Sequence, residues 1–245
     1  MGLDHYSYSS LTLFNTCPYA FYLEKIEGVD VVDNAFAQHG SLCHELIEEW
    51  ANGQLKVDEL PNEFKERYPI TVTASFPPYL AGGNYKQQVY DKGLGYFNAF
   101  DQFEGYHVIA AEKYFETNID DHKFTGVIDL ILQSDNGDSI ICDHKSKSLS
   151  SFKKNKQAMY RQQYLYSKPY YEMYGEFPKY LMFNLFNENV QVMQPFKKEE
   201  YDEALEWATG TINKIESCGI LDFLETKKED MFCREICSVR NSCGK

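Results

Sequence analysis

Two short apolar runs, each carrying one acid, constrain the fold of this 245-residue chain more than any other feature. The first run is Gly126–Ile131, with Asp129 among Val, Ile and Leu, and the second is Ile140–Lys145, with Asp143 after Ile-Ile-Cys. Short runs rich in Val, Ile, Phe and Tyr predict β-strands. A carboxylate inside such a strand is costly to bury unless a cation pairs with it. The two runs therefore predict adjacent strands that bring their acids to one site.

The rest of the chain predicts a mixed α/β fold. Strands are expected at 107–117, 123–133, 139–146, 179–186 and 189–195. Apolar residues at helical spacing predict helices that end near Gly53, over 86–104, over about 155–175 and over 199–217. The proline-rich residues 54–84, with Gly82-Gly83, predict a loop with one short helix. We expect one domain over 1–245, built from a helical part (1–105), an α/β core (106–217) and a Cys-rich tail (218–245).

The turn between the second and third strands decides whether the two acids share a face of the sheet. A two-residue turn at Asn136-Gly137 would place residue 144 opposite Asp129 and would turn Asp143 to the other face. A three-residue loop over 135–137, with its glycine left-handed, or an equivalent bulge, places Asp129 opposite Asp143. We predict the second register, because only that register builds a shared site.

Two carboxylates beside a lysine suit a site for a hard divalent cation. Mg²⁺ and Mn²⁺ prefer oxygen ligands, which Asp129 and Asp143 would supply. Lys145 follows Asp143 by two residues and points to the same face, where its ammonium could orient water or stabilise charge on a phosphoryl group. The same spacing fits an alternative, in which Asp129 ends a strand and Asp143 forms a surface ion pair with Lys145.

Further motifs give the chain a resemblance to a known family. In order, they are Ser9-Ser10-Leu11 with Phe14, Cys17-Pro18-Tyr19-Ala20-Phe21-Tyr22, Gly40-x-x-x-His44-Glu45-Leu46, Asp129, Asp143-x-Lys145 and Gln162-Gln163-Tyr164-Leu165-Tyr166. This series resembles the PD-(D/E)XK nuclease superfamily. Within it, the chain is similar to the RecB-like branch, which includes the AddB nuclease domain and the CRISPR-associated iron–sulfur exonucleases. The chain departs from the family's Q-h-x-x-Y motif at Gln163, where the family has an apolar residue.

The resemblance implies a fold and a reaction. The fold would be restriction-endonuclease-like, with a mixed sheet flanked by helices and an N-terminal helical elaboration. His44, Asp129 and Asp143 would hold Mg²⁺ or Mn²⁺, and Lys145 would assist the hydrolysis of a phosphodiester bond. The alternative for His44 is the commoner fate of a lone histidine, a buried and hydrogen-bonded residue of a helix.

The resemblance also assigns residues around that centre. Gln162 and Tyr166 are four residues apart and share a helix face, and in the family they line the substrate cleft and take part in catalysis. Ordinary helix packing is the alternative, especially for Tyr166. We expect Glu112, in the first strand, to be a strand-edge acid rather than a support for the metal.

The seven cysteines point to a second metal centre. Their odd number and the absence of a secretory signal argue for reduced thiols. Cys233, Cys237 and Cys243 lie close together with spacing C-x3-C-x5-C and need a fourth partner, and composition alone permits zinc. The resemblance implies instead a [4Fe–4S] cluster with Cys17 as the fourth ligand, although the family's first gap is x2. The remaining thiols, expected in the core or as spares, are Cys43, Cys142 and Cys218.

The charge distribution is uneven. Acids outnumber bases by 37 to 24, and the net charge of −13 argues against a protein that coats nucleic acid. Residues 144–168, however, contain seven bases and no acid, with Phe152, Tyr160 and Tyr164 interleaved. This segment could bind backbone phosphates while its aromatics stack on bases, although most lysine runs are solvated faces. The residues expected to contact DNA are Lys147, Lys153, Lys154, Lys156 and Arg161.

These patterns leave three functions open. The first is a metal-dependent exonuclease that acts on single-stranded DNA or DNA ends and carries a structural [4Fe–4S] cluster. The second is a non-catalytic DNA-binding or assembly subunit with the same fold, and the third is a zinc-stapled binding module. We expect DNA as a partner, together with recombination or CRISPR-adaptation proteins. We also expect a cytoplasmic location, because the start lacks signal-peptide features and no apolar stretch approaches the roughly 20 residues of a membrane span.

Overall fold

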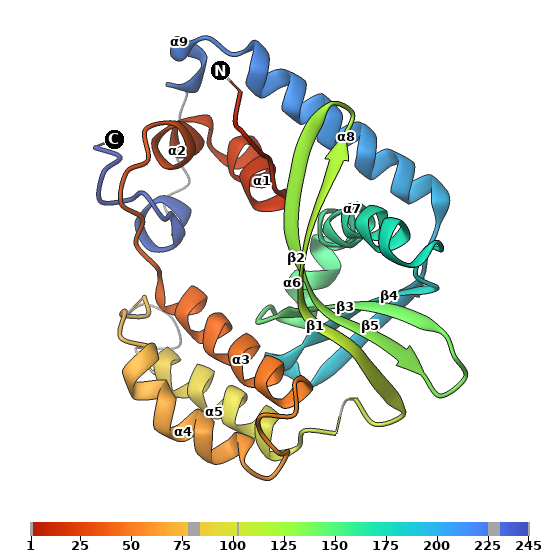
Figure 1. Ribbon diagram of the computed structural model, residues 1–245. Coiled ribbons are helices and arrows are strands. Elements are labelled where there is room, and N and C mark those ends of the chain that lie inside the picture. Colours follow the sequence, from red (N-terminus) through yellow and green to blue (C-terminus); the bar gives the residue numbers. More distant parts are fainter. Residues whose placement is uncertain (1, 78–83, 102, 225–230, 245) are drawn as a thin grey trace.

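A five-stranded mixed sheet forms the centre of the computed structural model, which describes residues 2–77, 84–101, 103–224 and 231–244 (Figure 1). The strands follow one another in space as in sequence: β1 (Tyr106–Ile119), β2 (His122–Ser134), β3 (Ser139–Lys145), β4 (Tyr180–Leu185) and β5 (Val190–Pro195). Neighbouring strands are antiparallel except for β3 and β4, which are parallel. A parallel pair needs a long crossover, and the helices between β3 and β4 supply it.

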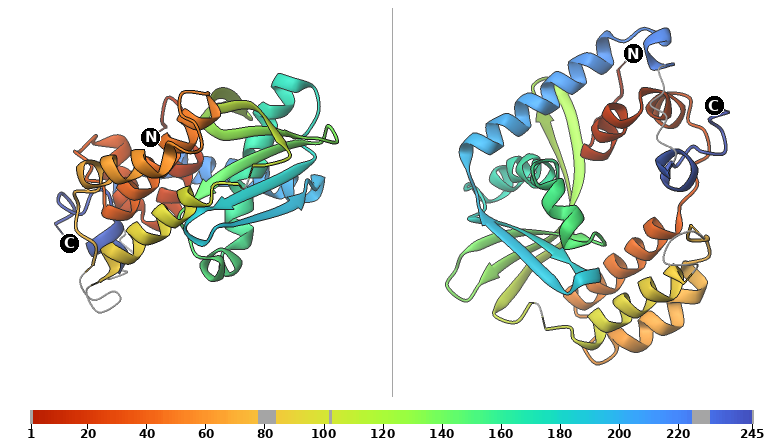
Figure 2. Two further views of the ribbon diagram at one scale, coloured as in Figure 1. Left: turned by 90° about the horizontal axis from the view of Figure 1, so that it is seen from below. Right: turned by 180° about the vertical axis from the view of Figure 1, so that it is seen from behind.

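Two groups of helices cover the two faces of the sheet. One group is α3 (Ala35–Ala51), α4 (Leu60–Thr71) and α5 (Tyr85–Asn98). The other is α1 (Tyr8–Thr16), α6 (Leu149–Lys154), α7 (Lys156–Tyr174) and α8 (Lys198–Ser217). Successive residues of a strand point to opposite faces, so the two faces have different cores. Leu130 and Cys142 belong to the core with α3–α5. Ile131 and Ile141 belong to the core with α1, α6, α7 and α8. Figure 2 shows from behind that the α3–α5 group stays well separated from α7 and α8.

The first hairpin is long and irregular. The pairing of β1 with β2 shifts by one residue between Val108 and Ala110, which is a β-bulge. Glu112 has a φ of 44°, a left-handed conformation that is uncommon for residues other than glycine. The two strands pair again at Lys113 and Ile128. Glu112 therefore lies opposite Asp129, the acid of β2, between the pair of Ala111 with Leu130 and the pair of Lys113 with Ile128.

The two ends of the chain lie side by side (Figure 1). The N-terminal helices α2 (Pro18–Phe21) and η1 (Tyr22–Ile26), the latter a π-helix, meet the short helix α9 (Ile220–Phe223) and the π-helix η4 (Phe232–Ile236). The backbone N–H of Val32 donates to the carbonyl of Ser238 at 2.8 Å, and Arg240 donates back to the carbonyl of Val32 at 3.1 Å. The ring of Phe223 stacks on Phe21 at 6.0 Å. These contacts bring the Cys-rich tail against the segment that carries Cys17.

Most of the predicted elements are confirmed, and two predictions need correction. Within residues 54–84, the structure has the twelve-residue helix α4 rather than a short one. Pro61 lies in its first turn, where a missing N–H costs nothing, and Phe64 and Tyr68 form its buried face. The helix predicted over 86–104 ends at Asn98. The predicted loop at Gly82-Gly83 lies outside the described residues.

None of the described helices combines the length and the apolar character that a membrane span requires.

Candidate active site

The turn between β2 and β3 places the two strand acids opposite each other. Ser134 donates its N–H to the carbonyl of Asp138 at 2.9 Å, which closes a three-residue loop, and Gly137 in this loop has a φ of 83°. The pairing of Leu130 with Cys142 continues the same register. The next residues along the strands, Asp129 and Asp143, therefore face each other on one side of the sheet. The predicted register is confirmed.

Asp143 forms a buried ion pair with Lys145. The Nζ of Lys145 donates to Oδ1 of Asp143 at 2.9 Å and lies 2.6 Å from Oδ2. The Asp143 side chain is only 5% exposed, so this is not the surface ion pair of the alternative interpretation. Burial raises the pKa of Asp143 to about 6, with Lys145 opposing the shift and Asp129 adding to it. Burial alone would lower the pKa of Lys145, but the two aspartates outweigh it and keep the ammonium charged.

Asp129 lies between this ion pair and His44. Its Oδ2 accepts the backbone N–H of His144 at 2.8 Å and lies 3.5 Å from Nδ1 of His44. Burial alone would raise the pKa of Asp129, but His44, His144 and Lys145 lower it below its usual value. Asp129 is therefore ionised and ready to bind a cation.

His44 presents one ring nitrogen to the acids. Its Nε2 lies 3.1 Å from the carbonyl oxygen of His144. A carbonyl only accepts, so Nε2 carries a hydrogen, and the lone pair of an uncharged ring is then on Nδ1. A backbone acceptor of this kind commonly fixes the tautomer of a metal-ligating histidine. Because α3 belongs to the core on the other face of the sheet, His44 reaches Asp129 past the C-terminal end of β3.

Glu112 completes the group, although the sequence predicted only an acid at a strand edge. Its Oε1 lies 3.9 Å from Nδ1 of His44, and His44, Glu112 and Asp129 offer ligand atoms that all lie within 4.8 Å of one another. Burial, together with the charges of Asp129, Glu48 and Asp143, raises the pKa of Glu112 to about 8. One signal in the sequence could have located Glu112. Ile119 pairs with His122 across a two-residue turn, and the same register, extended along both strands, places Glu112 opposite Asp129.

The cluster therefore has the composition of a divalent-metal site. Of the predicted ligands, His44 and Asp129 belong to the compact group, whereas Asp143 lies outside it among the described residues and is held by Lys145. Burial first, and then repulsion from the neighbouring carboxylates, raises the pKa values of Glu112 and Asp143. A divalent cation would relieve that repulsion, and one imidazole with carboxylates fits Mn²⁺ or Mg²⁺.

Gln162 and Tyr166 lie on α7 beside Lys145. Both line a cavity of about 440 Å³ that Lys145 also lines. Burial raises the pKa of Tyr166, and the charges of Asp143 and Asp129 raise it further. A Cβ atom at Gly126 would lie 3.1 Å from the Tyr166 hydroxyl and 2.6 Å from Cζ of Phe115, so the glycine lets the tyrosine approach β2.

The site opens toward two cavities. The first is the cavity of Gln162 and Tyr166, which α1 and Phe232 of the tail also line. The second has a volume of about 480 Å³ and contains His44, Glu112 and further residues of α3. Lys145 lines both cavities, so a chain-like ligand crossing from one to the other would pass its ammonium.

The residues predicted to bind DNA spread away from the acids. Lys153 and Lys154 lie in the last turn of α6 and are exposed. Lys147 is near the site, since the charge of Lys145 adds to the effect of burial in lowering its pKa. Lys156 and Arg161 line a different cavity on α7.

The predicted cluster cysteines come together from both ends of the chain. Cys17 and Cys237 are 7% and 6% exposed in one small core, against which Cys243 packs. Burial raises the pKa of Cys237, and the neighbouring Cys243, Cys17 and Cys233 raise it further. Among the described residues, no three of these thiols lie within 4.8 Å of one another. A zinc ion with Zn–S bonds of about 2.3 Å would hold its thiolates roughly 3.8 Å apart. As expected, Cys43 and Cys142 are buried in the core.

Carboxylates, an imidazole and a half-buried lysine at the end of a mixed sheet define the site of a metal-dependent hydrolase. The family model described as PD-(D/E)XK nuclease superfamily matches residues 5–244, so the chain belongs to that superfamily. Its members are nucleases that use divalent metals. No curated protein matches the chain.

Proposed function

We propose that this protein is a metal-dependent DNA exonuclease of the RecB-like branch, which acts on single-stranded DNA or DNA ends. The observation that carries the proposal is the half-buried Lys145 ammonium, bonded to the buried Asp143 and lining two cavities. A charged lysine is costly to bury, and its position beside three carboxylates suits a reaction in which negative charge develops on a phosphate.

Each residue of the site has a part in this reaction. His44, Glu112, Asp129 and Asp143 would hold Mg²⁺ or Mn²⁺. The bound ion supplies positive charge that polarises the phosphodiester and makes water a better nucleophile. Lys145 stays protonated and donates to the attacking water or to a phosphate oxygen.

Two residues of α7 would position the strand. Gln162 offers an amide that can both donate and accept, and the Tyr166 hydroxyl stays protonated because its pKa is raised. Both lie next to Lys145, so they would hold the phosphate or sugar adjacent to the scissile bond.

The basic segment would guide the DNA backbone. Lys147, Lys153, Lys154, Lys156 and Arg161 follow Lys145 along β3, α6 and α7, and the acidic remainder of the protein repels DNA elsewhere. Single strands suit this surface, because aromatic side chains among the bases can stack on unpaired bases.

A [4Fe–4S] cluster on Cys17, Cys233, Cys237 and Cys243 completes the proposal. The four thiols gather from both ends of the chain, and no three of them lie within 4.8 Å of one another among the described residues. The cluster would have a structural role. Phe232, next to Cys233, lines the cavity with Lys145 and Tyr166, so the tail forms part of the substrate-binding region.

The proposal includes the setting of the protein. Residues 1–245 would act as one nuclease domain in the cytoplasm, with recombination or CRISPR-adaptation proteins as partners. The support for this setting is the resemblance to the RecB-like branch, together with the match of the superfamily over residues 5–244.

Digestion of labelled DNA tests the activity. A 5′-labelled linear single strand and a covalently closed single-stranded circle are incubated with Mn²⁺, and with EDTA as the control. We expect degradation of the linear strand with Mn²⁺ only and survival of the circle. Cutting of the circle would show an endonuclease. Binding without cleavage of either DNA would favour the non-catalytic subunit.

A further inference from the structure

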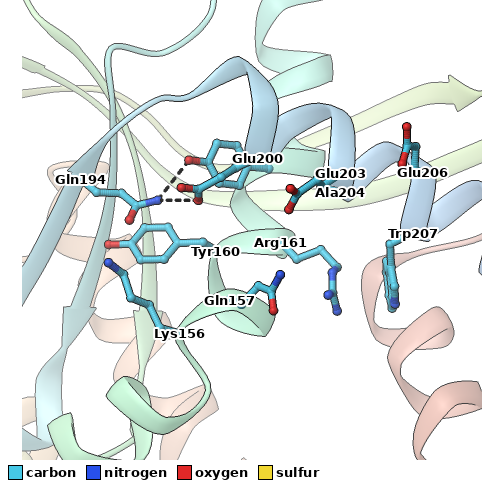
Figure 3. A pocket seen from close by; sticks show the side chains of 11 residues that line it. Lys156, Gln157, Tyr160, Arg161, Gln194, Glu200, Glu203, Ala204, Glu206 and Trp207 are labelled. Atoms are coloured by element: carbon cyan, nitrogen blue, oxygen red, sulfur yellow. Dashed lines mark hydrogen bonds between the residues drawn. The ribbon is translucent and has the colours of Figure 1, made fainter.

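A third cavity, separate from the carboxylate cluster, lies between α7 and α8 (Figure 3). Its volume of about 740 Å³ is within the range of small-molecule sites, roughly 300–1,000 Å³. Aromatic, cationic and acidic side chains line it, among them Lys156, Tyr160, Arg161, Glu200, Glu203 and Trp207. Such a mixture suits a planar ligand with polar edges better than a purely apolar one.

One end of the cavity is a stacking surface. The guanidinium of Arg161 lies over the Trp207 ring, 4.5 Å from its centroid, and Figure 3 shows the two side chains next to each other. Tyr8 extends this aromatic group, with its ring centroid 5.9 Å from that of Trp207. Guanidinium planes and aromatic rings are the surfaces on which proteins stack unpaired bases.

The other end of the cavity holds an unsatisfied hydroxyl. Tyr160 is 2% exposed, and its hydroxyl has no hydrogen-bond partner among the described residues. The neighbouring Tyr164 differs, because its hydroxyl accepts a hydrogen bond from Gln194 at 3.0 Å. The exposed Lys156 places its ammonium over the Tyr160 ring, 5.5 Å from the centroid, so a ligand that moves this flexible side chain aside gains access to the hydroxyl.

Tyr8 connects this cavity with the active site. It lines the cavity of Lys145 and Gln162, and its hydroxyl donates to the carbonyl of Ala158 on α7 at 2.6 Å. The same ring touches Trp207. A strand that leaves Lys145 along α1 therefore meets the stacking surface of Arg161 and Trp207 next.

The charges of the cavity indicate which part of a nucleotide it would hold. Glu200, Glu203 and Glu206 outnumber Lys156 and Arg161, so the highly charged phosphates of a free nucleoside triphosphate would be repelled. A base is neutral, and its N–H groups pair well with carboxylates. The phosphates of the same strand would remain outside, near the exposed lysines of α6.

We propose that this cavity accepts one unpaired base of the DNA strand bound at the active site. The base stacks on Arg161 and Trp207 and Glu203 contacts its polar edge, while the Tyr160 hydroxyl at the other end of the cavity contacts the next nucleotide of the strand. The inference rests on the proposed function for the source of the strand, and it makes single-stranded DNA the preferred substrate, because a paired base cannot enter.

Tryptophan fluorescence tests the stacking directly. The chain has two tryptophans, so the Trp50→Phe variant leaves Trp207 as the sole reporter. The probes are a single-stranded oligodeoxynucleotide and a strand of the same length made of abasic sites, both in EDTA to prevent cleavage. We expect the normal strand to quench Trp207 and the abasic strand to leave it unchanged. Equal quenching by both strands would overturn the proposal, because it would show phosphate contacts alone.

Binding affinity provides the second measurement, by fluorescence anisotropy of a labelled strand in the otherwise wild-type protein. We expect Trp207→Ala to weaken binding roughly 5- to 150-fold, which is the range for losing one stacked base. Tyr160→Phe should weaken binding without lowering the melting temperature, because the lost hydroxyl has no partner in the free protein. Lys198→Ala, which removes an exposed cation from α8 outside the cavity, is the matched control and should bind as wild type does.

The outcomes separate this inference from the proposed function. A wild-type protein that cleaves single strands but binds them as tightly after Trp207→Ala would overturn the inference alone. A protein that cleaves no DNA with Mn²⁺, yet shows base-dependent quenching of Trp207, would overturn the proposed function and leave the cavity as a base-binding site.

Discussion

Replacing Glu112 by Gln should stabilise the metal-free protein and weaken its binding of metal. Burial, together with the charges of the nearby Asp129, Glu48 and Asp143, raises the pKa of this side chain from 4.5 to about 8. Gln has the shape of the protonated acid and carries no charge, so it removes the repulsion without emptying the space. The same change removes one ligand from the group that contains His44 and Asp129.

The magnitude follows from the shift in pKa. An acid with a raised pKa keeps its proton in the folded state and loses it in the unfolded state, so stability falls as pH rises from about 4.5 to about 8. At pH 7, which is about 2.5 units above the ordinary pKa of 4.5, keeping this proton costs roughly 3 kcal/mol at 1.36 kcal/mol per unit. The side chain is 29% exposed, and screening by water reduces the expected gain of Glu112→Gln to about 2 kcal/mol.

Urea denaturation in EDTA, between pH 5 and pH 8, measures this effect for wild type and variant. The free energies of unfolding should nearly coincide at pH 5 and diverge in favour of Glu112→Gln toward pH 7. With Mn²⁺ the order should reverse, because a ligand at 100 times its Kd adds about 2.7 kcal/mol to the protein that binds it.

The matched control is Glu116→Gln on the same strand, where the side chain is 50% exposed and pairs with Lys123. Such a surface pair contributes less than about 1 kcal/mol, so this variant should follow wild type at every pH. Parallel pH curves for Glu112→Gln and wild type, or a less stable variant at pH 7 without metal, would refute the reasoning.

Three further predictions concern other parts of the molecule. Gly126→Ala should destabilise the fold by about 1–3 kcal/mol in thermal or urea unfolding, because the new Cβ would meet Phe115 and Tyr166, whereas Gly210→Ala on α8, with open space around it, should cost nothing. Replacing Cys17, Cys233, Cys237 or Cys243 by serine should remove the iron and lower the melting temperature, as measured by absorbance, iron content and thermal unfolding. The control variant Cys142→Ser should keep its iron. Full iron content in Cys17→Ser would show that Cys17 is not a ligand. Burial lowers the pKa of His144 to about 3, so the folded protein keeps this ring neutral and should lose stability as pH falls below about 6.5; a His144→Gln variant with the same acid dependence as wild type would contradict this.

The strand acids could be predicted because a β-sheet has a strict alternation. The three-residue loop at Gly137 and the apolar runs around Asp129 and Asp143 together fix which side chains face each other, and the structure has that register. Contacts between elements far apart in the sequence could not be predicted in this way. The alternation says nothing about which helix reaches the acids, and His44 comes from a helix on the other face of the sheet.

Glu112 and the cavity of Trp207 show what local patterns miss. Glu112 sits at an irregular point of β1 with a φ of 44°, and no strand propensity predicts such a conformation. Trp207 and Arg161 are 46 positions apart and meet only because α7 packs against α8. The prediction of a loop with one short helix for residues 54–84 is wrong because prolines usually interrupt helices. Here Pro61 lies in the first turn of α4 and Pro69 lies within the helix.

The rate of DNA hydrolysis in the Lys145→Ala variant tests the central claim most directly. Wild type, Lys145→Ala and the control Lys179→Ala are compared on a single-stranded DNA with Mn²⁺. The control removes an exposed lysine that directly precedes β4 and pairs with Asp138, away from Asp129 and Asp143. Circular dichroism confirms that each variant is folded. The account predicts a loss of roughly 10²- to 10³-fold or more for Lys145→Ala, because its ammonium stabilises charge only as the bond breaks, and an unchanged rate for Lys179→Ala. A folded Lys145→Ala protein that cleaves DNA at the wild-type rate would contradict the assignment of this site.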